Sequence, residues 1–140
     1  MNVLIGVLTV FVCTVVQCAF IAALKSILLR WKGIARIGGS FWEMTILLSA
    51  VTSFLFIGMM IQVYIWALAL YATGEIETFR KTLYFSMVNF TTLGYGDITL
   101  SSERAVLGPM EAANGILMLG LSTSALFSVL HELRLGSKKT

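Results

Sequence analysis

The residues with the most specific chemistry lie in one short stretch of the second half of the chain, Thr91-Thr92-Leu93-Gly94-Tyr95-Gly96-Asp97. Two glycines alternate with Leu93 and Tyr95, between threonine hydroxyls and a carboxylate. Glycine adopts backbone angles that cost other L-residues energy, so successive carbonyl groups in such a stretch can point the same way. A row of aligned carbonyl oxygens is a site for a dehydrated cation. The stretch therefore predicts that backbone oxygens, and not catalytic side chains, carry the chemistry.

The composition places the chain in a membrane. It has 140 residues, of which 58% are hydrophobic and 12% are charged, and its mean hydropathy is +0.90. Soluble domains are about 45–50% apolar and about 25% charged, so this chain cannot cover its surface with polar groups. Because a membrane-spanning helix needs about 20 apolar residues, the length allows three spans. The net charge of +3 comes from Lys and Arg in short connections, which indicates membrane topology and not nucleic-acid binding.

Three apolar runs are separated by polar connections, so we predict an all-α membrane protein with three transmembrane helices. Residues 1–28 are expected to form an N-terminal transmembrane helix, because no basic residue precedes Lys25 and the apolar run is too long for a signal peptide. Residues 29–43 form a basic interfacial linker, and residues 134–140 form a basic tail. Gln17, in the first helix, is expected to bond a neighbouring helix.

The remaining stretch, 44–133, is predicted to form one unit around the glycine-containing loop. Its parts are an outer helix over 44–72, a short helix over 78–90, the loop over 91–97 and an inner helix over 102–133. The short segment is too polar to span, but its apolar residues recur at helical spacing after a candidate N-cap, Thr78. We expect a re-entrant helix that delivers the loop. Irregular backbone at membrane depth must be surrounded by protein or water, so other segments or chains must bury the loop.

The basic residues predict the orientation of the chain in the membrane. Segment 25–43 holds four Lys or Arg and the C-terminal tail holds three. By the positive-inside rule, these two segments face the cytoplasm, while the N-terminus and the loop face outside. We therefore expect a multi-pass protein of the plasma membrane. Three outer glutamates, Glu75, Glu77 and Glu103, either concentrate cations or, in the interpretation that we favour, are solvated loop charges.

The loop and its flanking helices resemble the selectivity filter and the two-helix pore domain of bacterial and related potassium channels. The resemblance implies a K⁺-selective channel that conducts passively and needs no cofactor other than the permeant ion. The ion-binding residues that it implies are Thr92, Leu93, Gly94, Tyr95 and Gly96, with K⁺ held by the carbonyls of Thr92 to Tyr95. One filter strand cannot encircle an ion, so the expected functional unit is a C4 homotetramer surrounded by membrane lipids.

The same resemblance implies a set of residues that support the filter. They are Thr91, Asp97, Tyr84, Phe85, Val88, Asn89 and Glu111. Tyr84 and Phe85 take the places of the family's aromatic pair, and Tyr95 is expected to pack against them. Val88 stands where some members have a glutamate, so a carboxylate pair behind the filter is absent. Asn89 is expected to supply hydrogen bonds instead.

The inner helix carries the candidate gating and cavity residues. They are Asn114, Gly115, Met118, Gly120, Ser122 and Leu126. The two glycines are either hinges or positions of close packing. Helical spacing from Gly115 places Met118, Ser122 and Leu126 toward a water-filled cavity. Glu111 either anchors the helix behind the filter, with Asn89 as partner, or acts as a protonation switch, and we favour the anchor.

Other functions fit the sequence less well. A weakly selective cation channel would require a distorted filter, and Tyr95 at its central position argues against that. A non-conducting regulatory subunit would not need Gly94 and Gly96. An enzyme is not expected, because the chain has one histidine, His131, and two cysteines, Cys13 and Cys18, that we interpret as buried thiols. No span carries Arg or Lys at every third position, so a voltage sensor is not expected. The sequence indicates no gating stimulus.

Overall fold

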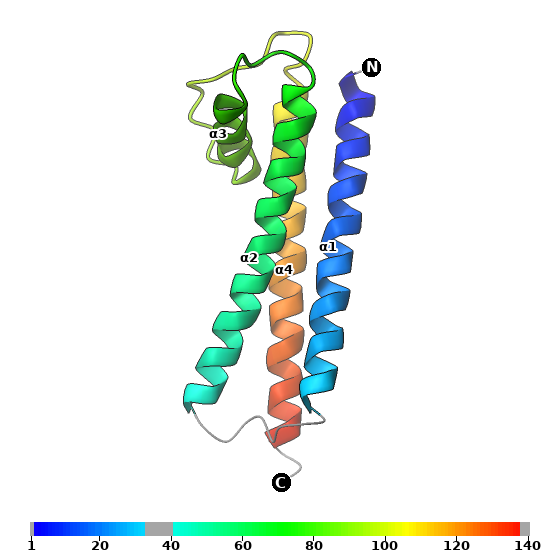
Figure 1. The fold of residues 1–140 in the computed structure, drawn as a ribbon, viewed down its shortest axis with the longest axis vertical. Helices are drawn as coiled ribbons and strands as arrows, with labels where there is room; N and C mark the ends of the chain where they lie inside the picture. Colours follow the sequence, from blue (N-terminus) through cyan, green and yellow to red (C-terminus); the bar gives the residue numbers. More distant parts are fainter. Residues whose placement is uncertain (1, 33–40, 138–140) are drawn as a thin grey trace.

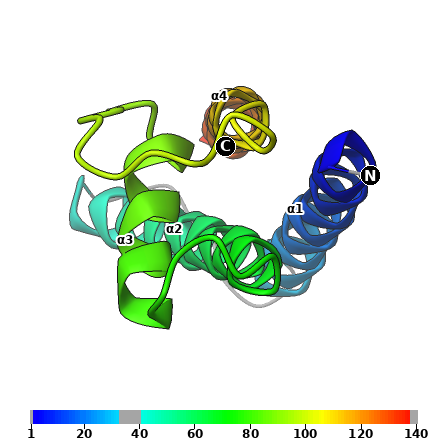
Figure 2. The same cartoon turned by 90° about the horizontal axis from the view of Figure 1, so that it is seen from above.

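The computed structural model describes residues 2–32 and 41–137, which form four α-helices and no strand (Figure 1). The helices are α1 (Asn2–Lys32), α2 (Phe41–Tyr71), α3 (Phe79–Phe90) and α4 (Leu107–Ser137). The long helices α1, α2 and α4 pack side by side, and the short α3 lies beside the end of α2. Seen from above in Figure 2, α1 and α3 lie on opposite sides of α2. The start of α1 and the end of α4 lie at opposite ends of the bundle, as three spans require.

The three long helices carry the apolar surface that a membrane protein needs. The stretches Asn2–Arg30, Phe41–Tyr71 and Leu107–His131 are each long and apolar enough to cross a membrane. Large apolar side chains point outward from all three helices, among them Leu4, Phe56 and Phe127. Such a surface is unfavourable in water but matches the hydrocarbon of a bilayer. The predicted all-α fold is confirmed for the residues that the structure describes, and three of its helices are long and apolar enough to cross a membrane.

Two helices include residues that we assigned to the linker. α1 continues through residues 29–32, and α2 begins at Phe41, so both ends of the predicted 29–43 linker are helical. Lys and Arg are good helix formers, so the fall in hydropathy at Lys25 and Arg30 ends the apolar run without ending the helix. The helix α4 likewise continues beyond its apolar run: it ends at Ser137 and so includes part of the predicted basic tail. The rest of the linker and of the tail lies outside the described residues.

The inner helix begins at Leu107 and not at 102, because the preceding segment has other partners. The backbone N–H and the hydroxyl of Ser101 donate to the Glu75 carboxylate at 2.9 and 2.8 Å. These bonds hold the turns at residues 102–106 beside the connection between α2 and α3. Pro109 consequently falls in the first turn of α4. Residues of the first turn have no partner within the helix for their N–H groups, so the missing N–H of proline costs no hydrogen bond there.

A polar layer joins the three long helices near the middle of the bundle. Gln17 of α1 donates from Nε2 to the Ser122 hydroxyl of α4 at 2.9 Å, and Gln62 of α2 donates to Gln17 Oε1 at 2.6 Å. Gln17 and Gln62 are fully buried. The predicted bond between Gln17 and a neighbouring helix is confirmed, and it attaches α1 to both α2 and α4.

Replacing Gln17 by leucine is expected to destabilise this bundle, because Ser122 and Gln62 then lose their shared partner. Hydrogen bonds between membrane helices contribute about 0.6 kcal/mol on average and at most about 2 kcal/mol, so we expect a loss of about 1 kcal/mol. Thermal unfolding of the purified protein in detergent measures it. Thr14→Val is the matched control, because its hydroxyl bonds only the Val10 carbonyl within α1. Equal stability of the two variants would show that the layer contributes nothing.

Candidate functional site

The short helix α3 is fixed at both ends by its own side chains. Thr78 is its N-cap, as predicted, and its side chain accepts a hydrogen bond from the Lys81 N–H. At the other end, the Thr91 hydroxyl donates to the Met87 carbonyl at 2.7 Å. Between them, one face of the helix is buried against α2 and α4 (Figure 2), and it comprises Thr82, Phe85, Ser86, Val88 and Phe90. The loop that follows α3 therefore begins from a rigid position.

The backbone of this loop alternates in handedness. Thr92, Gly94 and Gly96 have φ angles of 62°, 55° and 74°, and no positive φ occurs at Leu93 or Tyr95. A positive φ is uncommon for a residue with a side chain, and such strain persists where the surroundings enforce it, often at functional sites. The Val88 carbonyl accepts the N–H groups of Leu93 and Gly94, at 2.9 and 3.3 Å, and so ties the strained segment to α3. The alternating conformation is the one for which the two glycines are needed.

The loop is open to its surroundings in a single chain. Residues 91–97 are all exposed, including the apolar side chains of Leu93, at 56%, and Tyr95, at 65%. Tyr95 lies close enough to Tyr84 to act on its hydroxyl electrostatically, but most of its side chain stays exposed in the single chain, so the predicted packing against Tyr84 and Phe85 stays a prediction. Phe85 instead belongs to the buried cluster that includes Leu70 and Leu107.

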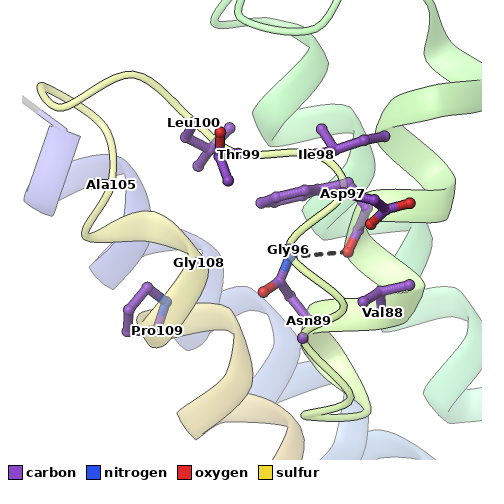
Figure 3. Close-up of a pocket in the computed structure, with 12 residues that line it drawn as sticks. Val88, Asn89, Gly96, Asp97, Ile98, Thr99, Leu100, Ala105, Gly108 and Pro109 are labelled. Carbon is purple, nitrogen blue, oxygen red and sulfur yellow. Dashed lines mark hydrogen bonds between the residues drawn. The ribbon is translucent and has the colours of Figure 1, made fainter.

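A cavity of about 270 Å³ lies behind the loop (Figure 3). Its walls come from the end of α3, from the loop and from the start of α4, and include Val88, Asn89, Asp97, Gly108 and Pro109. Asn89 does not supply the predicted hydrogen bonds to the filter or to Glu111, because its Nδ2 donates to the Phe85 carbonyl at 3.0 Å. Asp97 has a different partner: a hydrogen bond to its carboxylate raises the pKa of the Tyr84 hydroxyl.

Gly115 is the point at which α4 touches the end of α3. A Cβ atom at this position would overlap the Phe90 carbonyl oxygen and would lie 2.8 Å from the Phe90 carbonyl carbon. At Gly120, by contrast, a Cβ atom would meet nothing within 4 Å. Of the two interpretations of Gly115, the structure favours close packing, because only a residue without a side chain lets the two backbones approach this closely.

The predicted cavity-facing residues of α4 lie inside the subunit, so this assignment is wrong. Met118 packs with Cys13, Val63 and Trp66, and Ser122 bonds Gln17. Leu126 packs against a second cluster that contains Leu24 and Val51. The reason is that α1 and α2 together cover this face of α4. Helical spacing from Gly115 correctly placed Met118, Ser122 and Leu126 on one face of α4. That face, however, packs against other helices and does not line a water-filled cavity.

Glu111 is fully buried, and its position also differs from the prediction. It does not pair with Asn89 but lies beside the Ser86 hydroxyl of α3. Asn114, one turn further along α4, is 1% exposed and lies beside the Cys13 thiol of α1. Cys13 is buried as predicted, whereas Cys18 is exposed on the outer surface of α1. Among the described residues, no group of three His, Cys, Asp or Glu could hold a metal ion.

Glu75 has a structural role that sequence reasoning missed. Its carboxylate pairs with Arg104 at 2.8 Å, and Arg104 also donates to the Thr73 carbonyl at 2.9 Å. Together with the Ser101 bonds, this clamp joins the segments that enter and leave the loop region. The Ser101 backbone N–H, the Ser101 hydroxyl and the Arg104 guanidinium hold the pKa of Glu75 below its usual range. The only sequence signal was a pair of opposite charges on the two flanking connections.

This clamp is expected to weaken in acid. The folded-state pKa of Glu75 lies below that of an unfolded glutamate, about 4.3, so its stabilisation is complete above that pH and is lost as the pH falls through the folded-state pKa. Glu75→Gln should therefore lower the unfolding temperature at neutral pH and have little effect once the pH lies below the folded-state pKa of Glu75. Glu77→Gln is the control, because Glu77 pairs with Lys81 only at 3.7 Å on the exposed surface. An equal effect of Glu75→Gln at both pH values would contradict the clamp.

The described chain therefore combines three helices that are long and apolar enough to cross a membrane with a short helix and a strained loop at one end. A family model for ion channels matches residues 9–132, most of the chain. The chain belongs to this ion channel family. The comparisons with curated proteins and with solved structures found no match.

Proposed function

We propose that this chain is the subunit of a K⁺-selective channel that conducts ions passively down their gradient. The observation that carries the proposal is the positive φ at every second residue of Thr92–Gly96, directly after a short helix. An alternating backbone lets successive carbonyl oxygens face one axis, and rings of such oxygens replace the hydration shell of K⁺. The carbonyls of Thr92, Leu93, Gly94 and Tyr95 would bind the ion, with the Thr92 hydroxyl at the inner end.

The exposure of the loop supports a homotetramer. One chain supplies one row of carbonyls, and a ring around an ion needs four rows related by a fourfold axis. The same assembly would bury the exposed Leu93 and Tyr95 side chains and would surround the irregular backbone with protein at membrane depth. The carboxyl end of α3 leads into the loop, and the partial negative charge of a helix C-terminus favours a cation there.

The inner cavity of such a tetramer would be lined by a different face of α4 from the one that the sequence indicated. Ile116, Gly120, Thr123 and Phe127 are exposed and recur at helical spacing on the side of α4 that adjoins Gly115. This face is free of α1 and α2. Gly120 and the Thr123 hydroxyl offer the small and polar surface that a hydrated ion requires, whereas the buried Met118 and Ser122 do not.

The proposed orientation follows from the basic residues. The N-terminus and the filter face outside, the C-terminus faces the cytoplasm, and lipids of the plasma membrane contact the outward apolar side chains. The proposal is tested with the purified full-length protein in liposomes. Native mass spectrometry should find a tetramer, and a K⁺ gradient should drive K⁺ flux without added energy. A monomeric protein without flux would favour a non-conducting subunit, and equal Na⁺ and K⁺ flux would favour a weakly selective channel.

A further inference from the structure

A second polar site lies inside each subunit, behind α3 and away from the conduction loop. It contains Trp66 of α2, Ser86 of α3, and Glu111 and Asn114 of α4, each at most 1% exposed. The atoms without a direct hydrogen-bond partner are Trp66 Nε1, Ser86 Oγ, both Glu111 carboxylate oxygens, and the oxygen and nitrogen of the Asn114 amide. Buried polar groups in proteins nearly always have partners, so this concentration in one place needs an explanation.

These side chains come together from four helices. The Ser86 hydroxyl lies beside the Glu111 carboxyl. The Cys13 thiol of α1 lies beside Asn114 and is close enough to Glu111 for an electrostatic interaction with its carboxylate. Cys13 in turn packs in one cluster with Trp66 and with Met118, which lies one turn beyond Asn114. The site adjoins the close backbone contact between Gly115 of α4 and Phe90 of α3.

The mixture of donors and acceptors decides which ligand fits. A bare cation suits the Glu111 carboxylate but would face the N–H donors of Trp66 and Asn114. An anion suits those donors but would face the carboxylate, and an apolar molecule would satisfy none of the groups. Water donates two hydrogen bonds and accepts two, so it satisfies both the donors and the acceptors of this cluster.

We infer that this cluster is a buried hydration site, in which ordered water molecules bridge Glu111 to Ser86 and connect Asn114 and Trp66. The bridging water would link the inner helix α4 to α3 and α2 beside the Gly115 contact, and so would hold the inner helix and the filter-bearing helix in register. The site lies within one subunit, and it depends neither on the permeant ion nor on the number of subunits.

The inference is tested by cryo-electron microscopy of the full-length protein in lipid nanodiscs, at a resolution that shows ordered water. Solvent density should lie within hydrogen-bond distance of the Glu111 carboxyl and the Ser86 hydroxyl. It should be lost in Glu111→Leu and kept in Thr82→Val, since the buried Thr82 hydroxyl donates to the carbonyl of Thr78, the N-cap of the same helix, and not to the cluster. A dry site in which Glu111, Ser86 and Asn114 bond one another directly would overturn the inference.

A second measurement decides the question if Glu111→Leu does not fold. In solid-state NMR of the wild-type protein in lipid, the indole N–H of Trp66 should show magnetisation transfer from water. Its signal is assigned among the three tryptophans by its loss in Trp66→Phe. An indole N–H at position 66 that receives no magnetisation from water would also overturn the inference.

Discussion

Alanine at position 115 is expected to prevent the inner helix from packing against the end of α3. The new methyl group would overlap the Phe90 carbonyl oxygen, and this obstacle is backbone and not a flexible side chain. Phe90 is 1% exposed and is the last residue of α3, so α3 cannot move aside without moving the loop. Overpacking a core costs about 1–3 kcal/mol, and we expect Gly115→Ala to lie at or above the upper end of that range.

Gly120→Ala is the matched control, because it adds the same methyl group to the same helix where nothing lies within 4 Å. Thermal unfolding in detergent compares the two variants with the wild-type protein. Gly115→Ala should unfold at a clearly lower temperature and lose ion flux in liposomes, whereas Gly120→Ala should be close to wild type in stability. If Gly115→Ala is as stable as Gly120→Ala, the close contact between α3 and α4 is not a requirement of the fold.

Alanine at position 94 should have the opposite profile, with loss of conduction and an intact fold. A Cβ atom at Gly94 meets nothing within 4 Å, so the substitution does not disturb packing within the subunit. The φ angle of 55°, however, costs a residue with a side chain about 1–2 kcal/mol. In a tetramer the four copies sum to at least about 4 kcal/mol, which is roughly a thousandfold shift away from the alternating conformation.

Gly74→Ala provides a control for the backbone strain itself. Gly74 has a φ of 74° and open space around it, but it lies in the connection after α2 and outside the loop. Both variants should retain the helical fold by circular dichroism. Only Gly94→Ala should lose K⁺ flux in liposomes. Normal flux in Gly94→Ala, or an equal loss of flux in Gly74→Ala, would show that ion conduction does not depend on the alternating backbone of the loop.

The helices could be predicted from sequence because each depends on local signals. Apolar length predicted α1, α2 and α4, and the Thr78 cap together with helical spacing predicted α3 to within a residue. The errors at the ends of the long helices have a common cause. Hydropathy reports where the lipid ends, but a helix ends where its backbone hydrogen bonds find other partners, as they do at Ser101.

Which face of α4 is buried within the subunit could not be predicted, because it depends on which helices pack against α4. Ser122 is small and polar, which suits either a hydrated cavity or a partner within the bundle. The partner is Gln17, more than a hundred residues earlier in the chain, and no local pattern connects the two. The clamp between Glu75 and Arg104 was missed for the same reason, since the charges of exposed loops carry no periodicity that pairs them.

The backbone of the loop was the part of the site that the sequence predicted best. Alternating glycines indicated a backbone that ordinary residues avoid, and Gly94 and Gly96 have positive φ angles. Thr92 shares this conformation without being glycine, which no composition rule would indicate. The polar site around Glu111 was only half anticipated. A buried acid was expected, but its surroundings on α2 and α3 depend on the packing of four helices.

The central proposal, selectivity for K⁺ by the backbone of Thr92–Tyr95, is tested most directly by the reversal potential of the purified channel. Full-length protein is incorporated into a planar bilayer with K⁺ on one side and an equal concentration of Na⁺ on the other. We expect a reversal potential that is strongly displaced toward the K⁺ equilibrium potential, with the wild-type current absent in Gly94→Ala. A reversal potential near zero, which means equal permeability to the two ions, would contradict the proposal.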